Sequence, residues 1–264
     1  MGNEKISLTA EAVAFIRQKT QKDRFSKYFV TPRSTTIIKI AAALVSENIL
    51  SHLFSKRMDI SEDLHSAIEK FRPEQIVELG AGYSTFGLEY VLAHPGCIYI
   101  ETDFPKVVSL KKSIVNKIIR VEKLRELDAL VFVPMDLVRE DLYDSLKNKI
   151  KRGRKTLVFS EGLNTYLDQK NYDSLVANVI KFLKHSKEGS VYLSHEPTAK
   201  QREKMFPSAG IKILRGAMSI LIHNRFHTHF KTENELKNYF IKLGFAHVDI
   251  IKRRPYSTTY LAGL

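Results

Sequence analysis

The sequence contains a single cysteine, Cys97, among its 264 residues. One cysteine excludes an internal disulfide and a metal site built from several cysteines, and such usage is typical of a reducing compartment. The chain also lacks an apolar run of the ~20 residues that a membrane span needs. Residues 1–6 (MGNEKI) provide neither the apolar core of a signal peptide nor a myristoylation site. We therefore expect a cytoplasmic protein without a membrane partner.

Negative charge is scarce, because 29 acidic residues against 42 Lys and Arg give a net charge of +13. Such a balance occurs in nucleic-acid-binding proteins, in proteins that attract acidic small molecules, and where it serves only solubility. The densest basic cluster precedes the predicted strand at 156–160 and comprises Lys147, Lys149, Lys151, Arg152, Arg154 and Lys155. It has no aromatic residue for base stacking, and a loop that enters a parallel strand lies opposite the ligand edge of the sheet. We interpret it as a solvated charged surface.

An apolar run at residues 76–79 is followed by a Gly-x-Gly turn at Gly80 and Gly82, and a second run ends in Glu101 and Asp103. Glycines let the backbone turn sharply and let a ligand approach it, and an acid that ends the next strand can accept hydrogen bonds from both ribose hydroxyls. This pattern predicts the first βαβ unit of a nucleoside-binding fold.

A third glycine, which a dinucleotide site needs near position 85, is missing, since Thr85 stands there. The helix start is therefore less suited to a pyrophosphate. Glu78, at the end of the first run, would repel a pyrophosphate but suits a ligand with an ammonium or sulfonium group. The pattern favours S-adenosylmethionine over NAD, and a strand-turn-helix without a ligand is the alternative.

The rest of the chain alternates between short apolar runs and helical periodicity. We predict strands at 76–79, 98–102, 130–134, 156–160 and 190–195. We predict intervening helices at 84–93, 105–120, 139–150 and 169–185. This alternation is typical of an α/β, Rossmann-like parallel sheet with helices on both faces.

The two ends of the chain differ from this alternation. Helices are predicted at 9–20, 34–54 and 61–71, so we assign residues 1–60 to an N-terminal helical cap and 61–264 to the Rossmann-like domain. A cap segment near 199–230 and a helix at 232–243 precede runs at 246–251 and 258–262. The short link between these runs predicts an antiparallel hairpin that completes a seven-stranded mixed sheet.

Four pieces of sequence occur in order: residues 77–85 (VELGAGYST), 101–105 (ETDFP), Asp136-Leu137, and 160–167 (SEGLNTYL). Together they resemble the leucine carboxyl methyltransferase family, whose bacterial branch includes polyketide O-methyltransferases. The stretch 7–17 (SLTAEAVAFIR) is similar to the opening helix of that branch. The resemblance implies a class I methyltransferase fold that uses S-adenosylmethionine.

The resemblance also implies roles in binding the methionine and ribose parts of this cofactor. Arg57 would hold the methionine carboxylate through two parallel hydrogen bonds, with Lys56 or Arg33 as substitutes and a surface arginine as the alternative. Gly80 and Gly82 would shape the pocket floor. The ribose acid would be Asp103, with Glu101 beside it, although Asp103 could also cap the following helix.

The remaining implied contacts concern the adenine, the ammonium and the methyl acceptor. Asp136 would accept a hydrogen bond from the adenine amino group, and Leu137 would supply a backbone donor. Glu161 would face the methionine ammonium, and Tyr166 would help to shape the acceptor site.

A sulfonium methyl group is already activated, so its transfer depends mainly on alignment and on the exclusion of water. A carboxylate acceptor is ionised at neutral pH and needs no general base, and the sequence shows no obvious base motif. We therefore interpret the protein as an O-methyltransferase for a carboxylate of a small, acidic metabolite. A phenol or alcohol acceptor would need a base, for which His195 is the candidate, with a structural role at a strand end as its alternative.

Two further function classes stay open. An RNA-binding protein or RNA methyltransferase is suggested by charge alone, but the fourth predicted strand leads into Glu161-Gly162-Leu163-Asn164 rather than the Asn/Asp-Pro-Pro-aromatic motif of base-amine methylation. A cofactor-binding domain without catalysis is the other. His223, His227 and His229 have no cysteine or helical carboxylate beside them, so we expect no metal and interpret them as a cap loop over the acceptor site.

Overall fold

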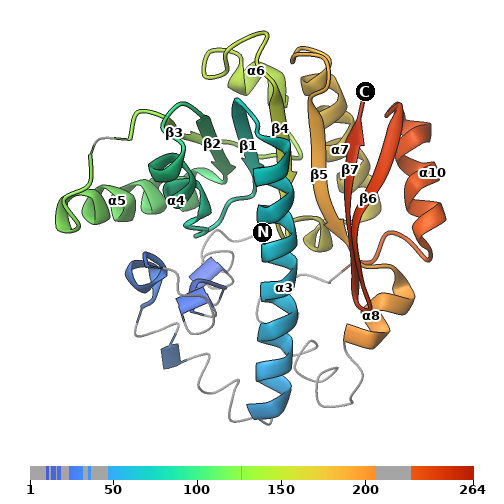
Figure 1. Cartoon of the computed structure of the whole chain (residues 1–264), viewed down its shortest axis with the longest axis horizontal. Helices are drawn as coiled ribbons and strands as arrows, with labels where there is room; N and C mark the ends of the chain where they lie inside the picture. The colour runs from blue at the N-terminus through green and yellow to red at the C-terminus, as the bar shows by residue number, and fades with distance from the viewer. Residues whose placement is uncertain are drawn as a thin grey trace.

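The computed structural model describes residues 10–11, 13–15, 17–18, 24–31, 35–36, 47–125, 127–205 and 227–264. Its strands are β1 (Gln75–Leu79), β2 (Ile98–Asp103), β3 (Leu130–Pro134), β4 (Thr156–Ser160), β5 (Val191–Glu196), β6 (His247–Arg254) and β7 (Ser257–Gly263). They form one seven-stranded sheet in the order β3-β2-β1-β4-β5-β7-β6, as Figure 1 shows. The predicted seven-stranded mixed sheet is confirmed.

The sheet reverses its winding direction beside β1. This strand pairs in parallel with β2 on one side and with β4 on the other. The chain then continues outward to β3 on the first side and to β5 on the second, both again parallel. Ligands of open α/β sheets bind at such a switch point, beyond the carboxyl ends of the strands.

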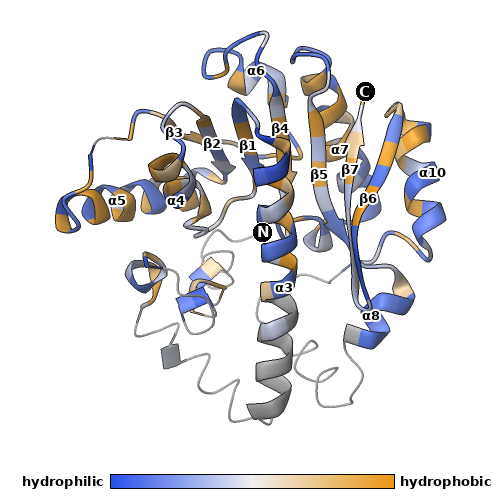
Figure 2. Ribbon diagram, viewed as in Figure 1, coloured by the Kyte–Doolittle hydropathy of each residue, from blue (hydrophilic) through white to orange (hydrophobic). Residues whose placement is uncertain are grey.

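Helices cover both faces of the sheet. They are α3 (Glu47–Phe71), α4 (Phe86–Ala93), α5 (Pro105–Val121), α6 (Leu142–Leu146), α7 (Gln169–Leu183), α8 (Ala199–Met205) and α10 (Glu233–Leu243). Because side chains alternate along a strand, Ile76 packs into the apolar cluster under α3, α4 and α5, whereas Val77 packs into the cluster under α6, α7 and α10. Figure 2 shows these apolar strands between helices with hydrophilic outer surfaces.

The predicted C-terminal hairpin is present. β7 lies between β5 and β6 and is antiparallel to both. Its interior position explains why Thr258 and Thr259 are almost fully buried. β6 forms the edge of the sheet and carries Lys252, Arg253 and Arg254, charged side chains of the kind that discourage further strand pairing at an exposed edge.

The helix predicted at 61–71 is continuous with the end of the helix predicted at 34–54, of which residues 34 and 37–46 lie outside the described residues. α3 runs without interruption from Glu47 to Phe71 through the link expected between helices at 34–54 and 61–71. The α3 sequence contains no Gly or Pro to break it, and Ile60, Leu64 and Ile68 form a buried stripe at helical spacing. The boundary assigned at residue 60 therefore falls inside a continuous helix. Among the described helices, none combines the length and the apolar character required to cross a membrane.

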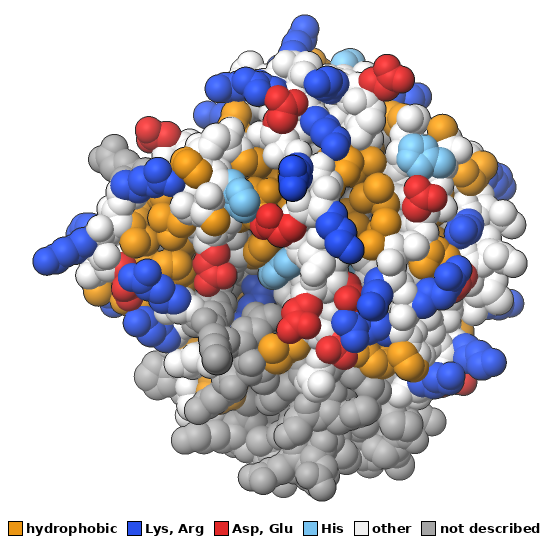
Figure 3. Space-filling model, viewed as in Figure 1, with side chains coloured by type: hydrophobic (Ala, Val, Ile, Leu, Met, Phe, Trp, Pro, Cys, Tyr) orange, Lys and Arg blue, Asp and Glu red, His pale blue; other side chains and the backbone are white. Residues whose placement is uncertain are grey.

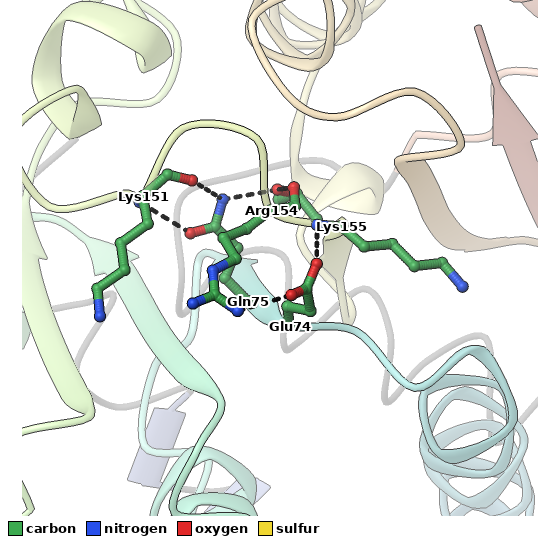
Figure 4. A network of polar contacts seen from close by, with 6 residues as sticks. Glu74, Gln75, Lys151, Arg154 and Lys155 are labelled. Atoms are coloured by element: carbon green, nitrogen blue, oxygen red, sulfur yellow. Dashed lines mark hydrogen bonds and ion pairs between the residues drawn. The ribbon is translucent and has the colours of Figure 1, made fainter.

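The basic cluster lies near α6, at the top of Figure 1, at the edge where the parallel strands begin. Figure 4 shows part of it engaged in structural contacts. Arg154 Nη1 lies 2.7 Å from Glu74 Oε1, and the Lys155 amide donates to Glu74 Oε2 at 2.8 Å. Lys155 Nζ donates to the Phe71 carbonyl at 2.9 Å. These contacts fasten the end of α3 to the loop before β4.

Lys and Arg side chains are spread around the face shown in Figure 3, with acidic side chains between them. Several basic side chains of the cluster form local pairs, as Lys147 does with Asp144. This distribution gives no continuous basic track across the visible face, which agrees with the interpretation of a solvated charged surface.

Candidate functional site

A cavity of about 790 Å³ lies at the carboxyl ends of β1 to β4, at the switch point of the sheet. Its lining includes one sequence-predicted residue or pair after each strand, namely Gly80 and Gly82 after β1, Asp103 at the end of β2, Asp136 and Leu137 after β3, and Glu161 after β4. The structure thus brings together residues spread over more than 80 positions. Parallel strands produce this convergence because their carboxyl ends share one edge.

The turn after β1 offers bare backbone to the cavity. Gly80 and Gly82 have φ values of 66° and 48°, in the left-handed region that favours glycine. A Cβ atom on Gly80 would lie only 3.1 Å from Leu163 Cδ1, which belongs to the loop after β4. The turn therefore requires glycine both for its conformation and for its packing, and it fits a cradle for a nucleoside ligand.

Asp103 fastens this turn to β2 and also lines the cavity. Its Oδ2 accepts a hydrogen bond from the Gly82 amide at 2.7 Å, and its Oδ1 accepts one from the Phe104 amide at 2.7 Å. Burial raises the pKa of the Asp103 carboxyl, while these two amides act in the opposite direction. Phe104 is the N-cap residue of α5 and makes no side-chain cap, so Asp103 does not occupy the capping position.

Glu101 does not line the cavity. Its carboxylate forms a buried ion pair with Lys111 of α5, with 2.5 Å between Oε2 and Nζ. A buried lysine needs a counter-charge, so the packing of α5 explains this placement better than a ligand does. Gly87 of α4 provides the space, because a Cβ there would collide with Glu101 Oε1.

Glu78 does line the cavity, but its carboxyl group is strongly buried. Burial raises the pKa of Glu78, and its strand neighbour Glu101 adds to this rise. Glu78 Oε2 accepts a hydrogen bond from the Tyr99 hydroxyl at 2.8 Å. The buried Lys111 ammonium acts in the opposite direction and lowers the pKa of Glu78.

The loop after β3 supplies Asp136 and Leu137 to the cavity wall. Asp136 Oδ1 accepts a hydrogen bond from the Val138 amide at 3.1 Å, and the Asp136 amide donates to Glu140 Oε1 at 2.7 Å. These short-range bonds hold the loop in one shape beside the cavity.

Arg17 is a cavity residue to which the sequence analysis gave no role. Its Nη2 lies 3.0 Å from Glu161 Oε2, and both side chains are less than one-tenth exposed. In the sequence, Arg17 stands directly after the apolar stretch 12–16, in the segment that is similar to the opening helix of the family, and this position is the signal that could have indicated its role. Arg57 lies in α3, and its side chain, like that of Lys56, is outside the described residues, as is Arg33.

Tyr166 and His227 line the cavity, whereas His195 is not among its lining residues. His195 lies on β5 opposite Thr259 of β7. His195 was the candidate base for a hydroxyl acceptor, and the histidine that lines the cavity is instead His227. The side chain of a histidine on a strand can point toward the helices that cover the sheet or toward the cavity at the strand end. Residue spacing in the sequence does not distinguish these two orientations.

The other histidines of the candidate cap loop have different surroundings. His229 stacks on Tyr172 with 4.1 Å between ring centroids, and its Nε2 lies 3.0 Å from the Asn164 carbonyl oxygen. Burial lowers the pKa of His229. His223 is outside the described residues. Within the described part of the chain, no three His, Cys, Asp or Glu side chains are grouped so as to hold a metal ion.

Several solved structures share this fold at low sequence identity. A putative methyltransferase from Thermobifida fusca YX is 12% identical, with 89% of each chain covered and a TM-score of 0.61. A putative O-methyltransferase from Nostoc punctiforme PCC 73102 is 14% identical over 96% of this chain and 72% of its own, with a TM-score of 0.53. Human N-acetylserotonin methyltransferase, solved in complex with SAM, is 15% identical over 97% of this chain and 66% of its own, with a TM-score of 0.51.

These likenesses concern the fold. The chain spans about half the length of other solved structures that it matches, such as PigF with SAH, of which it covers 51%. None of the curated proteins matches the sequence. Residues 8–180 match the family model for leucine carboxyl methyltransferase, and this range contains the glycine turn and every strand-end acid described above. The chain therefore belongs to the leucine carboxyl methyltransferase family, whose members use S-adenosylmethionine.

Proposed function

We propose that this protein is an S-adenosylmethionine-dependent O-methyltransferase that methylates a carboxylate of a small, acidic metabolite. The observation that carries the proposal is the convergence of the family motifs on one cavity at the switch point of the sheet. Its volume of about 790 Å³ falls within the ~300–1,000 Å³ of small-molecule sites. The basic cluster lies at the opposite edge of the sheet, so charge does not favour a nucleic-acid substrate at this cavity.

The donor occupies the side of the cavity formed by β1, β2 and β3. The Asp103 carboxylate accepts hydrogen bonds from the ribose hydroxyls, and Gly80 and Gly82 allow the ligand to lie against the backbone. Asp136 accepts from the adenine amino group, while the Leu137 amide donates to the ring. Each role follows from the family motif and from the position of that residue on the cavity wall.

The methionine part of the donor extends toward Arg17 and Glu161. An arginine fork fits a carboxylate, and a carboxylate fits an ammonium group. Arg17 and Glu161 already form an ion pair across the cavity wall, 3.0 Å apart. A zwitterionic amino-acid group can engage both partners at once, so we assign to Arg17 the carboxylate-holding role that the sequence analysis gave to Arg57.

Methyl transfer to a carboxylate then requires alignment more than proton transfer. The carboxylate oxygen attacks the sulfonium methyl carbon in line with the carbon–sulfur bond, and S-adenosylhomocysteine leaves as a neutral thioether. The N-terminal residues Ala10, Val13 and Arg17 line the cavity and reduce the access of water to the donor. Tyr166 shapes the acceptor side.

A hydroxyl acceptor is the second candidate, because His227 lines the same cavity as Tyr166. A histidine there could remove the proton of a phenol or alcohol as the oxygen attacks, a task that a carboxylate acceptor does not need. His227 replaces His195 as the candidate base in this alternative.

The test is methyl transfer from labelled S-adenosylmethionine to a panel of carboxylic acids, phenols and alcohols. Carboxyl methylation gives esters, which hydrolyse in mild alkali, whereas aryl and alkyl methyl ethers are stable. Base-labile products from acids support the proposal. Base-stable products from phenols, with a large loss of rate in His227→Gln, would replace it with the hydroxyl-directed alternative.

A further inference from the structure

Besides the carboxylates that line the cavity, a further carboxylate is buried next to its acceptor side without lining it. Glu196, at the end of β5, is 1% exposed. Its Oε1 accepts hydrogen bonds from Asn164 Nδ2 at 2.6 Å and from the Tyr172 hydroxyl at 3.0 Å. None of the proposed donor contacts uses this group.

Asn164 joins the loop after β4 to the ends of both β4 and β5. It is the first residue of the short 3-10 helix η2 (Asn164–Tyr166), and it is 3% exposed. Its Nδ2 also donates to Ser194 Oγ at 2.8 Å, and its Oδ1 accepts from Ser160 Oγ at 3.3 Å. The NH2 group and the carbonyl oxygen of the Asn164 side chain are therefore both hydrogen-bonded, which fixes the orientation of the amide.

The backbone of η2 is tied in turn to the segment 227–230. The Asn164 carbonyl oxygen lies 3.0 Å from His229 Nε2, and the Thr165 carbonyl oxygen accepts a hydrogen bond from the His227 amide at 2.8 Å. Tyr172, which donates to Glu196, stacks on His229 from the other side. The network thus links two segments that are more than 60 residues apart in the sequence.

Each of these two segments contributes one residue to the acceptor side of the cavity. Tyr166 belongs to η2 and His227 to the segment 227–230, and both line the cavity. The mutual placement of these side chains therefore depends on the bonds that hold the two segments together. A buried polar network whose members bond to one another favours one arrangement, because a slip leaves a buried group without its partner.

We propose that Glu196 and Asn164 are positioning residues for the methyl-acceptor site, in which the Glu196–Asn164 bond holds η2 against the segment 227–230 so that Tyr166 and His227 face the same acceptor. This inference rests on the proposed methyltransferase function. It assigns no contact with the donor to either residue, so donor binding and acceptor positioning are separable.

The test exchanges the hydrogen-bond donor at position 164 and the acceptor at position 196. Asn164→Asp removes the amide that donates to Glu196 Oε1 over 2.6 Å and places a second carboxyl group there. All variants are compared at pH 8.5, above the pKa of about 7 of Glu196, where the two facing carboxylates repel each other. Glu196→Gln alone keeps an oxygen that can accept both hydrogen bonds. The double variant Asn164→Asp/Glu196→Gln restores one donor and one acceptor, since the side-chain amide introduced by Glu196→Gln can donate to the new carboxylate.

The first readout is hydrogen exchange, which needs neither donor nor acceptor. Asn164→Asp should raise the exchange rate of the His227 amide at least tenfold and leave residues 78–84 at the glycine turn unchanged. The double variant should return the rate to within about threefold of the wild type. Unchanged exchange in Asn164→Asp, or a double variant as fast as the single one, would overturn the proposal.

The second readout separates positioning from a purely structural role. With the acid or phenol that turns over fastest in the panel, Asn164→Asp should lower kcat/KM for the acceptor at least tenfold, while the Kd of S-adenosylhomocysteine stays within twofold. The double variant should recover most of this loss. An equal loss of S-adenosylhomocysteine affinity would show that the network supports the whole site and would overturn the proposal.

A milder variant serves if Asn164→Asp does not fold. Tyr172→Phe removes one hydrogen bond to Glu196 and keeps the ring that stacks on His229, and it should cause a two- to fivefold loss in kcat/KM with normal donor affinity. Tyr143→Phe is the matched control, because it removes a hydroxyl bonded to Arg152 at the opposite edge of the sheet. Equal losses in both would overturn the proposal. A wild-type protein that binds no S-adenosylhomocysteine would instead refute the proposed function, and the exchange result would still decide the positioning role.

Discussion

The two sides of the cavity are built by different means. The donor side consists of strand-end loops in which neighbouring residues bond to one another, as Asp103 does with Phe104 and Asp136 with Val138. The acceptor side depends on contacts such as Asn164 with Glu196 and His227 with Thr165, which join distant segments. Local motifs specify most of the donor side, apart from the Gly82–Asp103 and Arg17–Glu161 contacts, whereas the acceptor side exists only after the β4–β5 end of the sheet and the segment 227–230 have met.

The largest expected effect concerns Arg17. Arg17→Met should weaken binding of S-adenosylhomocysteine by ~2–5 kcal/mol, because it leaves a ligand carboxylate and Glu161 without their charged partner. Titration calorimetry measures this loss. Arg17→Lys should be intermediate, since it keeps the charge and loses the fork.

Arg152→Met provides the matched control at the opposite edge of the sheet, where Arg152 bonds to the Tyr143 hydroxyl. It should bind the ligand as the wild type does. A defect at Arg152 would mean that the basic edge contributes to the site. Normal binding by Arg17→Met would return the carboxylate role to Arg57.

The next largest effect concerns the pH dependence of stability, in which Glu196 should differ from the surface carboxylates. Burial raises the pKa of Glu196 to about 7, from an ordinary value near 4.5. The folded state therefore holds this proton more tightly than the unfolded state, so the contribution to stability is complete below pH 4.5 and is lost as the pH rises to about 7. At ~1.4 kcal/mol per pKa unit, the loss is about 3 kcal/mol.

Glu196→Gln, which cannot ionise, should abolish this decline. Its free energy of unfolding should exceed that of the wild type by more at pH 8 than at pH 5, measured by urea denaturation at both values. The difference between the two proteins isolates Glu196 from nearby groups such as His229 and Arg202 that also act on its charge or titrate in this range. A parallel pH dependence for both proteins would exclude Glu196 as its source.

Substitutions at Asp103 test the donor side of the cavity through the affinity for S-adenosylhomocysteine. Asp103→Ala should lower the affinity for S-adenosylhomocysteine by ~1.5–3 kcal/mol, or roughly ten- to a hundredfold, because a buried and charge-assisted hydrogen-bond acceptor is lost. Asp103→Asn should lose less, since it retains an oxygen that can accept from the Gly82 amide. Equal affinities in all three proteins would remove Asp103 from the site.

The smallest effect concerns His227. If the acceptor is a carboxylate, His227→Gln should retain at least a tenth of the wild-type turnover, and the rate should be nearly constant between about pH 6.5 and 8.5. A general base would contribute ~10²–10⁴-fold and would give the rate profile an acidic limb. The pH–rate profiles of both proteins with the preferred acceptor distinguish these outcomes, and a large loss would favour a hydroxyl acceptor.

Periodicity and glycine spacing, which act over short distances along the chain, predicted most of the sheet and the glycine turn. The apolar runs predicted the strands to within a few residues, and the C-terminal runs predicted the β6–β7 hairpin. The sequence analysis was wrong about the break between residues 54 and 61, although the α3 sequence contains no Gly or Pro that would end a helix there. It also placed Glu101 beside Asp103 at the ribose site, since nothing in the sequence shows that Lys111 lies against that strand.

By itself, the sequence determined the α/β class, the glycine turn and the acids at the strand ends, because alternation, helical periodicity and the conformational freedom of glycine are local properties of the chain. Only the tertiary structure decided that Arg17 meets Glu161, that Glu101 neutralises a buried lysine, and that His227 rather than His195 reaches the cavity. These outcomes depend on which distant side chains compete for the same buried space and charge, and that competition takes place only when the sheet and its helices have packed together.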